Sequence, residues 1–363
     1  MYNPKVYFIG GAYMGCWYVR CFLPLLVNGW TGNYRGLTRK LKTIDEIMRE
    51  AQMADIIVFH RADSVAHHKL GMILKQMGKK IVFDNDDTFK IDETHAFYRL
   101  DDKGFAINVE YQNNLINNFI LNSDLVTCST DYLAQEYREI NPNVVVLPNT
   151  VNPDDWSKPL RNETDVVRIG VVGSTAYYHD FDIIKPVLKA LNDDKRVQLV
   201  MFGLHKEYLR KTNPLVNEVH TREYDFWDTL DNLEHVGWCS MVDYFTTLNE
   251  LRLDMMLIPR RESDFNKAKS NIKFLEAAMC EIPCIVSSFP NAPYEKDIDG
   301  TNGRYVKTNL TEDWLKEIEL LINNKDLRRS MGKKAREYVI KNYNIHNLGH
   351  LWRDAYSKLY EKN

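Results

Sequence analysis

The chain has 363 residues, of which 44% are hydrophobic and 27% charged, and it carries a formal net charge of −3. This length suits two domains better than one, and the composition is that of a soluble globular protein. The charge excludes a protein that coats nucleic acid over its whole surface, although a local basic face stays open. No apolar run approaches the roughly 18–20 residues that span a bilayer, so we expect no membrane insertion.

The first half of the chain alternates short apolar runs with helical patterns. We predict strands at 5–9, 55–60, 80–84, 125–128 and 144–147, and helices at 16–27, from 43, at 64–77, around 110–122 and from 130. The segment from Thr43 to Glu46 has the form of a capping box, which marks a helix start. This alternation is typical of a parallel sheet covered on both faces. We assign residues 1–155 to a first Rossmann-like domain.

A linker and a second strand–helix series follow. Residues 148–163 carry three prolines with Asn and Asp, which indicates a linker. Strands are predicted at 167–172, 197–202 and 254–259, with a helix at 241–251. After residue 306 the pattern is helical only, at 311–323, 325–341 and 345–360. We assign residues 156–340 to a second Rossmann-like domain and residues 341–363 to a C-terminal helix.

The cysteines and the first residues indicate a cytoplasmic protein. The six cysteines show no CxxC spacing and most lie in apolar contexts, which favours buried, reduced thiols over disulfides or a zinc site. The opening residues run straight into an apolar strand, without the charged region, apolar region and cleavage site of a signal peptide.

Residues 253–286 are the most informative segment, because they combine a strand, a basic loop, a helix with an acid and a second strand. Backbone N–H groups at a helix N-terminus favour an anion, and nearby cations neutralise it. Glu276, one turn into the helix, can accept two hydrogen bonds from a ribose diol. The segment therefore predicts a nucleotide-sugar site. The groups assigned to the donor's diphosphate are Lys273 first, then Lys269 and Ser270, then Arg260.

The run KSNIKFLEAAMCEIP, followed by SSFPNAPYEKDIDGTNGRYV, resembles the donor-binding signature of family 4-type glycosyltransferases. The resemblance covers most of the chain, the second half more closely than the first. It implies an α/β architecture of the GT-B type, with two Rossmann-like domains facing across a cleft and the C-terminal helices crossing back. It also implies that Lys273 holds the diphosphate, that Glu276 holds the ribose, and that transfer retains the anomeric configuration.

The donor helix departs from the family's pattern at one position. The family usually has two glutamates with seven residues between them, and the first position falls on Ala268, with Lys269 beside it. The usual sugar contact is therefore not carried over. The variant FNKAKS resembles a subgroup of bacterial and phage transferases, so we expect a bacterial cell or a phage-infected host cell.

Glycines follow the first strand of each predicted domain, where ligands of open α/β sheets bind. Gly173 would let the backbone approach a phosphate, and Ser174 adds a donor; a tight turn is the alternative. Gly11 lies in GGAYMG, which does not fit the GxGxxG fingerprint. The resemblance places the loop of Gly11 opposite the donor, where its backbone can approach the sugar phosphate, and a tight turn explains it equally well.

Three carboxylates end a predicted strand of the first domain. We interpret Asp84, Asp86 and Asp87 as acids of the interdomain cleft, with Asp84 and Asp87 as catalytic candidates. A solvated helix N-cap and a metal site are the alternatives. His60 ends the preceding strand and is a candidate for acid–base catalysis. The adjacent pair His179–Asp180 has the same potential beside the predicted donor loop.

Contacts to the acceptor are assigned to Arg20, Arg61, Asp86, Tyr34 and Arg35. Tyr34 and Arg35 belong to a basic run with interleaved aromatic residues. Such a run can follow a nucleic-acid backbone or stack on a base or sugar, and a solvated surface loop is the alternative.

These patterns together predict a glycosyltransferase that moves a sugar from a nucleotide-sugar, with a UDP-sugar as the expected donor, to a hydroxyl acceptor. The acceptor is a glycan or saccharide, or a hydroxymethylated base in phage DNA, which would require base extrusion. No cofactor and no metal ion are expected, because the GT-B resemblance implies that side chains and a helix dipole stabilise the diphosphate. A non-catalytic nucleotide-sugar binder and a GT-B sugar-nucleotide epimerase are the alternatives. The sequence does not indicate an oligomeric state.

Overall fold

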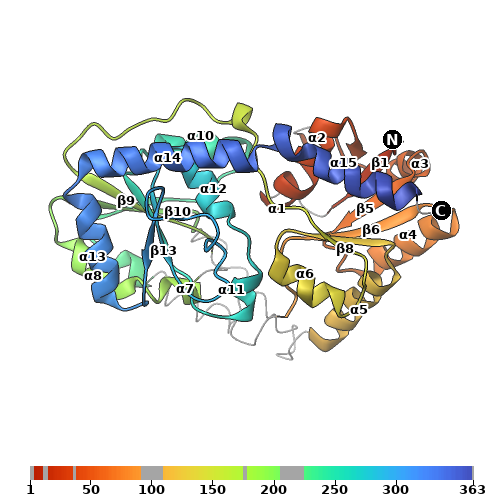
Figure 1. Ribbon diagram of the computed structural model, residues 1–363, viewed down its shortest axis with the longest axis horizontal. Helices are drawn as coiled ribbons and strands as arrows, with labels where there is room; N and C mark the ends of the chain where they lie inside the picture. Colours follow the sequence, from red (N-terminus) through yellow and green to blue (C-terminus); the bar gives the residue numbers. More distant parts are fainter. Residues whose placement is uncertain are drawn as a thin grey trace.

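The computed structural model describes residues 4–10, 15–35, 38–90, 109–174, 178–204 and 225–361, and only the backbone of residues 34–35, 38–41, 109–112 and 178. It consists of two α/β halves side by side (Figure 1). Each half contains a six-stranded sheet in which all neighbouring strands run parallel. The predicted two-domain α/β architecture is therefore confirmed.

The N-terminal sheet has the strand order β2-β1-β5-β6-β7-β8. Its strands are β1 (Val6–Ile9), β2 (Thr31–Gly32), β5 (Ile56–His60), β6 (Lys80–Asn85), β7 (Leu125–Cys128) and β8 (Val144–Val146). A short antiparallel pair, β3 (Tyr34–Arg35) and β4 (Thr38–Leu41), stands apart from it. The helices of the N-terminal half are α1 (Gly15–Trp17), the π-helical turn η1 (Tyr18–Phe22), α2 (Leu23–Asn28), α3 (Ile44–Gln52), α4 (Val65–Gln76), α5 (Val109–Asn122) and α6 (Asp131–Arg138).

The C-terminal sheet has the strand order β11-β10-β9-β12-β13-β14. Its strands are β9 (Val167–Val172), β10 (Val197–Phe202), β11 (Leu233–Val236), β12 (Met255–Ile258), β13 (Cys284–Ser287) and β14 (Arg304–Val306). Its helices are α7 (Tyr178–Phe181), α8 (Lys185–Asn192), α10 (Met241–Glu250), α11 (Asp264–Ala268), α12 (Ile272–Met279), α13 (Thr311–Ile322) and α14 (Lys325–Tyr343), after the linker turn η2 (Pro153–Asp155).

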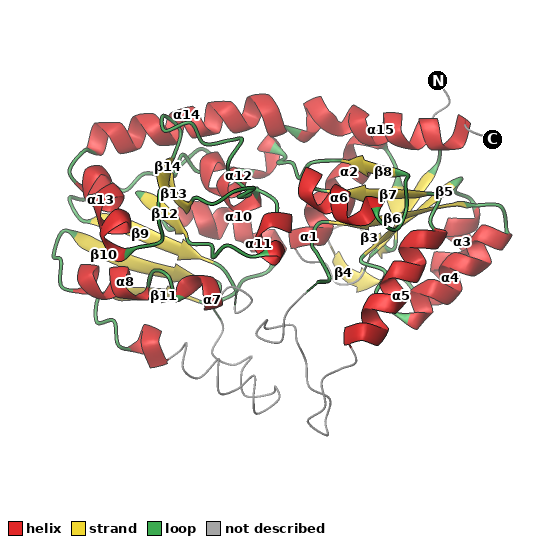
Figure 2. Ribbon diagram, turned by 60° about the horizontal axis from the view of Figure 1, so that its bottom comes forward, coloured by secondary structure: helices red, strands yellow, loops and turns green. Residues whose placement is uncertain are grey.

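Both sheets are buried on both faces, which explains their near-continuous apolar strands. Every residue of β1 and β5 is buried. Because successive side chains of a strand point to opposite faces, Tyr7 joins one core cluster and Phe8 another. The helices therefore cover each sheet from two sides, as Figure 2 shows.

Most element boundaries follow signals that are visible in the sequence. The capping box predicted at Thr43 is present, with the Thr43 side chain accepting from the Glu46 N–H and the Glu46 side chain accepting from the Thr43 N–H. The largely buried helix predicted over residues 16–27 is present, although it is not regular. This segment contains the π-helical turn η1, in which Tyr18, Val19, Arg20 and Cys21 are all buried. Arg20 lies within this π turn, and its side chain is in the protein interior.

The chain crosses between the halves twice, and the two crossings are hydrogen-bonded to each other. The Val151 N–H donates to the Tyr343 carbonyl oxygen, and the Ile345 N–H donates to the Val151 carbonyl oxygen, each over 2.9 Å. Beyond this point α15 (Ile345–Glu361) lies along the N-terminal half (Figure 1).

The predicted return of the last helix is confirmed. Trp352 and Tyr356 of α15 are fully buried in a core cluster of the N-terminal half. A Cβ atom on Gly349 would lie 2.5 Å from Val27 Cγ2, so glycine is needed where α15 crosses α2. The exact domain boundaries at residues 155 and 340 stay predictions.

The prediction that most cysteines are buried is confirmed, since four of the six are buried. All six are free thiols in the structure. Within the described residues, no helix combines the length and the apolar character that crossing a bilayer requires.

Candidate functional site

A cavity of about 210 Å³ opens at the carboxyl ends of β9 and β10, between α10 and α12. This is the edge of a parallel sheet at which ligands bind in open α/β proteins. All the lining residues except Gly15 come from the C-terminal half. Of the residues predicted for the donor, the cavity brings together Gly173, Ser174, Lys273 and Glu276.

Two glycines form a close backbone contact at the base of this cavity. Gly203 has a φ of +107°, and a Cβ atom there would lie 2.8 Å from the Gly173 carbonyl oxygen. The Gly173 N–H donates to the Phe202 carbonyl oxygen over 3.0 Å. The backbone therefore lines the cavity with no side chain at these two positions, which leaves room for a bulky group.

Three polar side chains meet on one wall of the cavity. The Lys273 ammonium lies 2.9 Å from Glu276 Oε2 and donates to the Tyr244 hydroxyl over 3.0 Å. The Tyr244 hydroxyl donates to Glu276 Oε2 over 2.7 Å. We call Lys273, Glu276 and Tyr244 the polar trio. It offers a cation and a carboxylate that are both largely buried, since 15% of the Lys273 side chain and 12% of the Glu276 side chain are exposed.

Tyr244 was missed by the sequence analysis. Its ring stacks on Phe202, with centroids 5.5 Å apart and an interplanar angle of 20°. Burial, together with the Glu276 charge, raises the pKa of Tyr244 well above its usual range, despite the opposing effect of Lys273. The phenol therefore stays a neutral donor. A tyrosine on an amphipathic helix is ordinarily read as a core residue, so the sequence held no signal for it.

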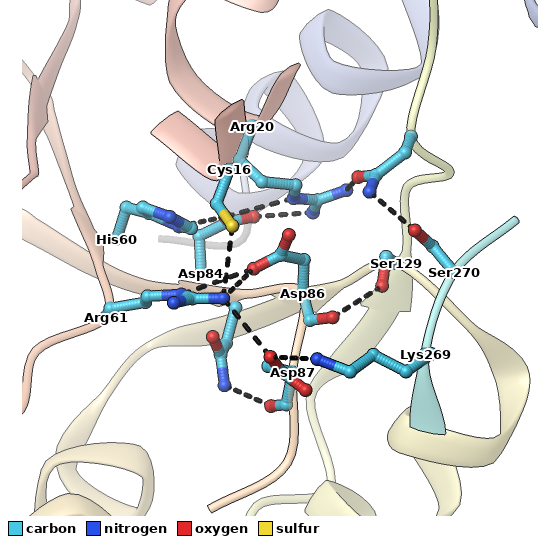
Figure 3. A network of polar contacts seen from close by, with 12 residues as sticks. Cys16, Arg20, His60, Arg61, Asp84, Asp86, Asp87, Ser129, Lys269 and Ser270 are labelled. Carbon is cyan, nitrogen blue, oxygen red and sulfur yellow. Dashed lines mark hydrogen bonds and ion pairs between the residues drawn. The ribbon is translucent and has the colours of Figure 1, made fainter. Parts of the chain in front are cut away.

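A second group of charged residues lies at the carboxyl ends of the N-terminal strands (Figure 3). The Asp84 carboxylate lies inside the protein. It accepts hydrogen bonds from Arg20, from His60 Nδ1 at 3.0 Å and from the Thr127 hydroxyl at 2.7 Å. Arg20 and Asp84 are both fully buried. The structure therefore argues against an acceptor contact for Arg20 and a catalytic role for Asp84, since a ligand has no access to either side chain.

His60 is also buried, with 3% of its surface exposed. Because the Asp84 carboxylate can only accept, His60 Nδ1 must donate to it. This contact fixes the ring of His60 against Asp84, and the burial of the ring argues against the predicted acid–base role.

Asp86 and Asp87 are paired with cations from both halves. Arg61, which has a φ of 54°, lies 2.8 Å from Asp86 Oδ1 and 3.4 Å from Asp87 Oδ2. Burial alone would raise the pKa of Asp86, but the charges of Arg61, His60 and Arg20, with the hydrogen bond from Arg61, together hold that pKa far below its usual range. Arg61 keeps 34% of its side chain exposed, so it remains accessible to a ligand.

The segment between α11 and α12 touches the N-terminal half through two side chains. Lys269 Nζ lies 2.6 Å from Asp87 Oδ2, and Asn149 Nδ2 donates to Ser270 Oγ over 2.8 Å. Neither Lys269 nor Ser270 lines the 210 Å³ cavity. Both line a second cavity, of about 230 Å³, whose walls come from both halves. Lys269 and Lys273 therefore line different cavities, although both were predicted to bind the diphosphate.

Arg260 is held in a buried ion pair. Its guanidinium lies 2.9 Å from Asp180 Oδ2, and only about a twentieth of either side chain is exposed. Asp180 also accepts from the Arg261 N–H at 3.0 Å and from Asn266 Nδ2 at 2.8 Å. This placement argues against the predicted donor contact of Arg260. Asp180 instead fixes the loop between β12 and α11.

The remaining predicted residues are outside the part that the structure describes. Gly11 is one of the undescribed residues, and the side chains of Tyr34 and Arg35 are not described. Among the described residues, no group of three or more His, Cys, Asp and Glu side chains has an arrangement that holds a metal ion.

Comparison with known proteins places the chain in a family. The family described as glycosyl transferases group 1 matches residues 153–338, just over half of the chain. The chain belongs to this family. The match contains the polar trio, both cavity glycines and the whole C-terminal sheet.

Among curated proteins, an uncharacterized glycosyltransferase of Methanocaldococcus jannaschii is 24% identical to this group 1 chain over 222 residues. That match covers 61% of this chain and 56% of the relative, so it spans about half the length of the curated protein.

Solved structures share the fold. Sucrose-phosphate synthase from Thermosynechococcus elongatus matches with a TM-score of 0.68 at 13% identity, over 99% of this chain and 100% of that one. HepE from Anabaena, in complex with UDP and glucose, matches with a TM-score of 0.66 at 11% identity, over 98% of this chain and 100% of that one. At such identities the likeness shows the GT-B fold of the group 1 chain.

Proposed function

We propose that this protein is a glycosyltransferase that takes its sugar from a nucleotide-sugar, with the nucleotide in the 210 Å³ cavity. The observation that carries this proposal is the polar trio, which places a cation and a carboxylate together at the carboxyl ends of the central strands of the C-terminal sheet. Membership of the group 1 family supports it. HepE has been solved with UDP-glucose, which supports a uridine nucleotide as the first donor to test.

The proposed roles follow from charge and position. Glu276 accepts hydrogen bonds from the ribose diol, and Lys273 neutralises the leaving diphosphate. Gly173 and Gly203 leave the backbone open to the ligand. Stabilising the charge that develops on a leaving group is commonly the largest single contribution to catalysis.

We propose that the acceptor hydroxyl binds across the cleft, at the N-terminal strand ends. Arg61, paired with the nearly buried Asp86, supplies an accessible charged group there, and the buried residues Arg20 and Asp84 hold the strand ends beneath it. A saccharide suits this polar surface. The proposal includes retention of the anomeric configuration, which rests on the resemblance of the donor helix.

We also propose that transfer requires no resident metal ion, because Lys273 supplies positive charge where the diphosphate would lie. Transfer that persists in excess EDTA supports this point, and transfer that stops and returns with Mg²⁺ or Mn²⁺ contradicts it.

The test is the release of nucleoside diphosphate from UDP-, GDP- and dTDP-sugars, each with a saccharide panel, plain DNA or hydroxymethylated DNA. Release from one donor that depends on a saccharide supports the proposal, and the product's anomeric NMR couplings then decide retention. Release that requires hydroxymethylated DNA would identify a DNA-modifying transferase. Binding of a nucleotide-sugar without release or transfer would indicate a binding protein, and isomerised free sugar an epimerase.

A further inference from the structure

The segment that leads into α12 is held from the other half of the molecule by Asp87. Lys269 Nζ lies 2.6 Å from Asp87 Oδ2, and each side chain is 13% exposed. Arg61 approaches the same oxygen at 3.4 Å. In Figure 3 the Lys269 side chain extends toward Asp87, which follows strand β6. This ion pair therefore joins the two domains at the predicted donor helix.

Lys269 precedes α12 and Lys273 lies in its first turn, and their ammonium groups have different partners. Lys273 pairs with Glu276 of its own helix and lines the 210 Å³ cavity. Lys269 pairs with a residue of the opposite domain and lines the 230 Å³ cavity. The Lys273 contact lies within one helix, whereas the Lys269 contact requires Asp87 of the N-terminal half.

We propose that Asp87 competes with the donor's diphosphate for Lys269, and so sets the affinity for the nucleotide. The inference rests on the proposed function, that a nucleotide-sugar binds at α12. A diphosphate carries more negative charge than one carboxylate, and a lysine ammonium on its flexible stem can exchange one anionic partner for the other. Asp87 is then a positioning residue, because it acts on the donor through Lys269.

The exchange has a consequence for the acceptor side. When Lys269 turns to the diphosphate, Asp87 loses its closest cation and keeps only the more distant Arg61. A carboxylate is thereby released beside Asp86, where the acceptor hydroxyl is proposed to bind. Donor binding thus prepares the acceptor site, and by thermodynamic reciprocity an acceptor that binds Asp87 strengthens donor binding.

The experiment measures the dissociation constant of UDP by calorimetry, without acceptor, for the wild type, Asp87→Asn, Lys269→Gln and the double variant. We expect Asp87→Asn to bind UDP more tightly, on the order of fivefold or more, because Lys269 is released. Lys269→Gln binds more weakly, and adding Asp87→Asn to it changes nothing further. The matched control is Asp131→Asn, which removes another interdomain ion pair, the one between Asp131 and Lys296 at 2.6 Å. This variant is expected to leave the affinity for UDP unchanged.

The Asp87→Asn variant is expected to fold, because the main-chain carbonyl of Asp87 still accepts from Asn85 Nδ2 and, at 2.9 Å, from the Tyr137 hydroxyl. Asp87→Ser serves in its place if it does not. Unchanged or weaker UDP binding by the Asp87 variant overturns the inference. So does tightening that persists without Lys269, or equal tightening by Asp131→Asn. A folded wild type that binds none of UDP, GDP and dTDP overturns the proposed function itself, which is a separate result.

Discussion

The guanidinium of Arg20 lies 2.6 Å from Asp84 Oδ2, and neither side chain is accessible to solvent. Burial alone would raise the pKa of Asp84, but the charge and hydrogen bonds of Arg20, with the hydrogen bond from His60, lower it below its usual range. Both groups are therefore charged inside the protein. Arg20 also donates to Asn149 Oδ1 over 3.2 Å, so the pair ties the π-helical turn to the linker that leads out of the N-terminal sheet.

Replacing Asp84 by Asn is expected to lower the free energy of unfolding by about 3–5 kcal/mol at pH 7, because Arg20 becomes a buried charge without a counter-charge. The folded-state pKa of Asp84 is depressed, so its stabilisation is present above the unfolded pKa of about 3.9 and is lost as pH falls below it. Urea unfolding at pH 7 and pH 3 measures both values. The difference between variant and wild type should shrink at the lower pH.

Asp131→Asn is the control for this stability effect, since Asp131 pairs with Lys296 where 65% and 80% of the side chains are exposed. It should cost less than about 1 kcal/mol. A similarly small loss for Asp84→Asn at pH 7 would contradict the structural role of the buried pair.

Lys273→Ala is expected to lower the rate of transfer by about 10²–10³, because it removes the cation that is proposed to neutralise the diphosphate. The midpoint of thermal unfolding should stay close to that of the wild type, since Tyr244 and Glu276 keep their mutual hydrogen bond when the Lys273 side chain is removed. Nucleoside diphosphate release under saturating donor measures the effect. Lys334→Ala, an exposed change on α14, is the control, and equal rates for both variants would refute the assignment.

The sequence predicts most of the fold because its signals are local. β7, β9 and β10 are found at the predicted residues, and Thr43, Ser64 and Thr130 cap the helices that they were expected to start. Short apolar runs and capping side chains act within a few residues, so one sequence is enough to place them.

The site is predicted only in part because its contacts are distant in sequence. Lys273 and Glu276 were found because a helix turn brings them together. Asp87 and Lys269 are 182 positions apart, and Arg20 and Asp84 are 64 apart. The sequence around each of these residues contains no signal that identifies its partner. Charged residues that the sequence presents as ligand contacts can thus be satisfied inside the fold, as Arg20 and Arg260 are.

Gly203→Ala is expected to destabilise the protein by about 1–3 kcal/mol, because a side chain is strained at a φ of +107° and its Cβ would lie 2.8 Å from the Gly173 carbonyl oxygen. Thermal unfolding measures the loss, and nucleotide affinity should fall as the cavity base shifts. Gly237→Ala, whose Cβ meets no atom within 4 Å, is the control. Unaltered stability of the Gly203 variant would show that the glycine contact is not needed.

Glu276→Gln is expected to abolish the preference for a ribonucleotide over a deoxyribonucleotide. A hydrogen bond to a charged group contributes about 1.5–3 kcal/mol, so wild type should bind UDP about 10- to 100-fold more tightly than 2′-deoxy-UDP. The ratio of the two dissociation constants is the quantity to compare, because any disturbance of Lys273 or Tyr244 affects both ligands alike and cancels.

Glu262→Gln provides the matched change of charge, on a carboxylate that is 54% exposed and pairs with Lys267 at 3.0 Å. Its ratio should equal that of the wild type. For Glu276→Gln the ratio should fall toward one, because the amide offers one neutral acceptor oxygen where the carboxylate offers charged ones. If the Glu276 variant discriminates between the two nucleotides as well as the wild type does, the ribose lies elsewhere, and the polar trio serves the diphosphate or the sugar instead.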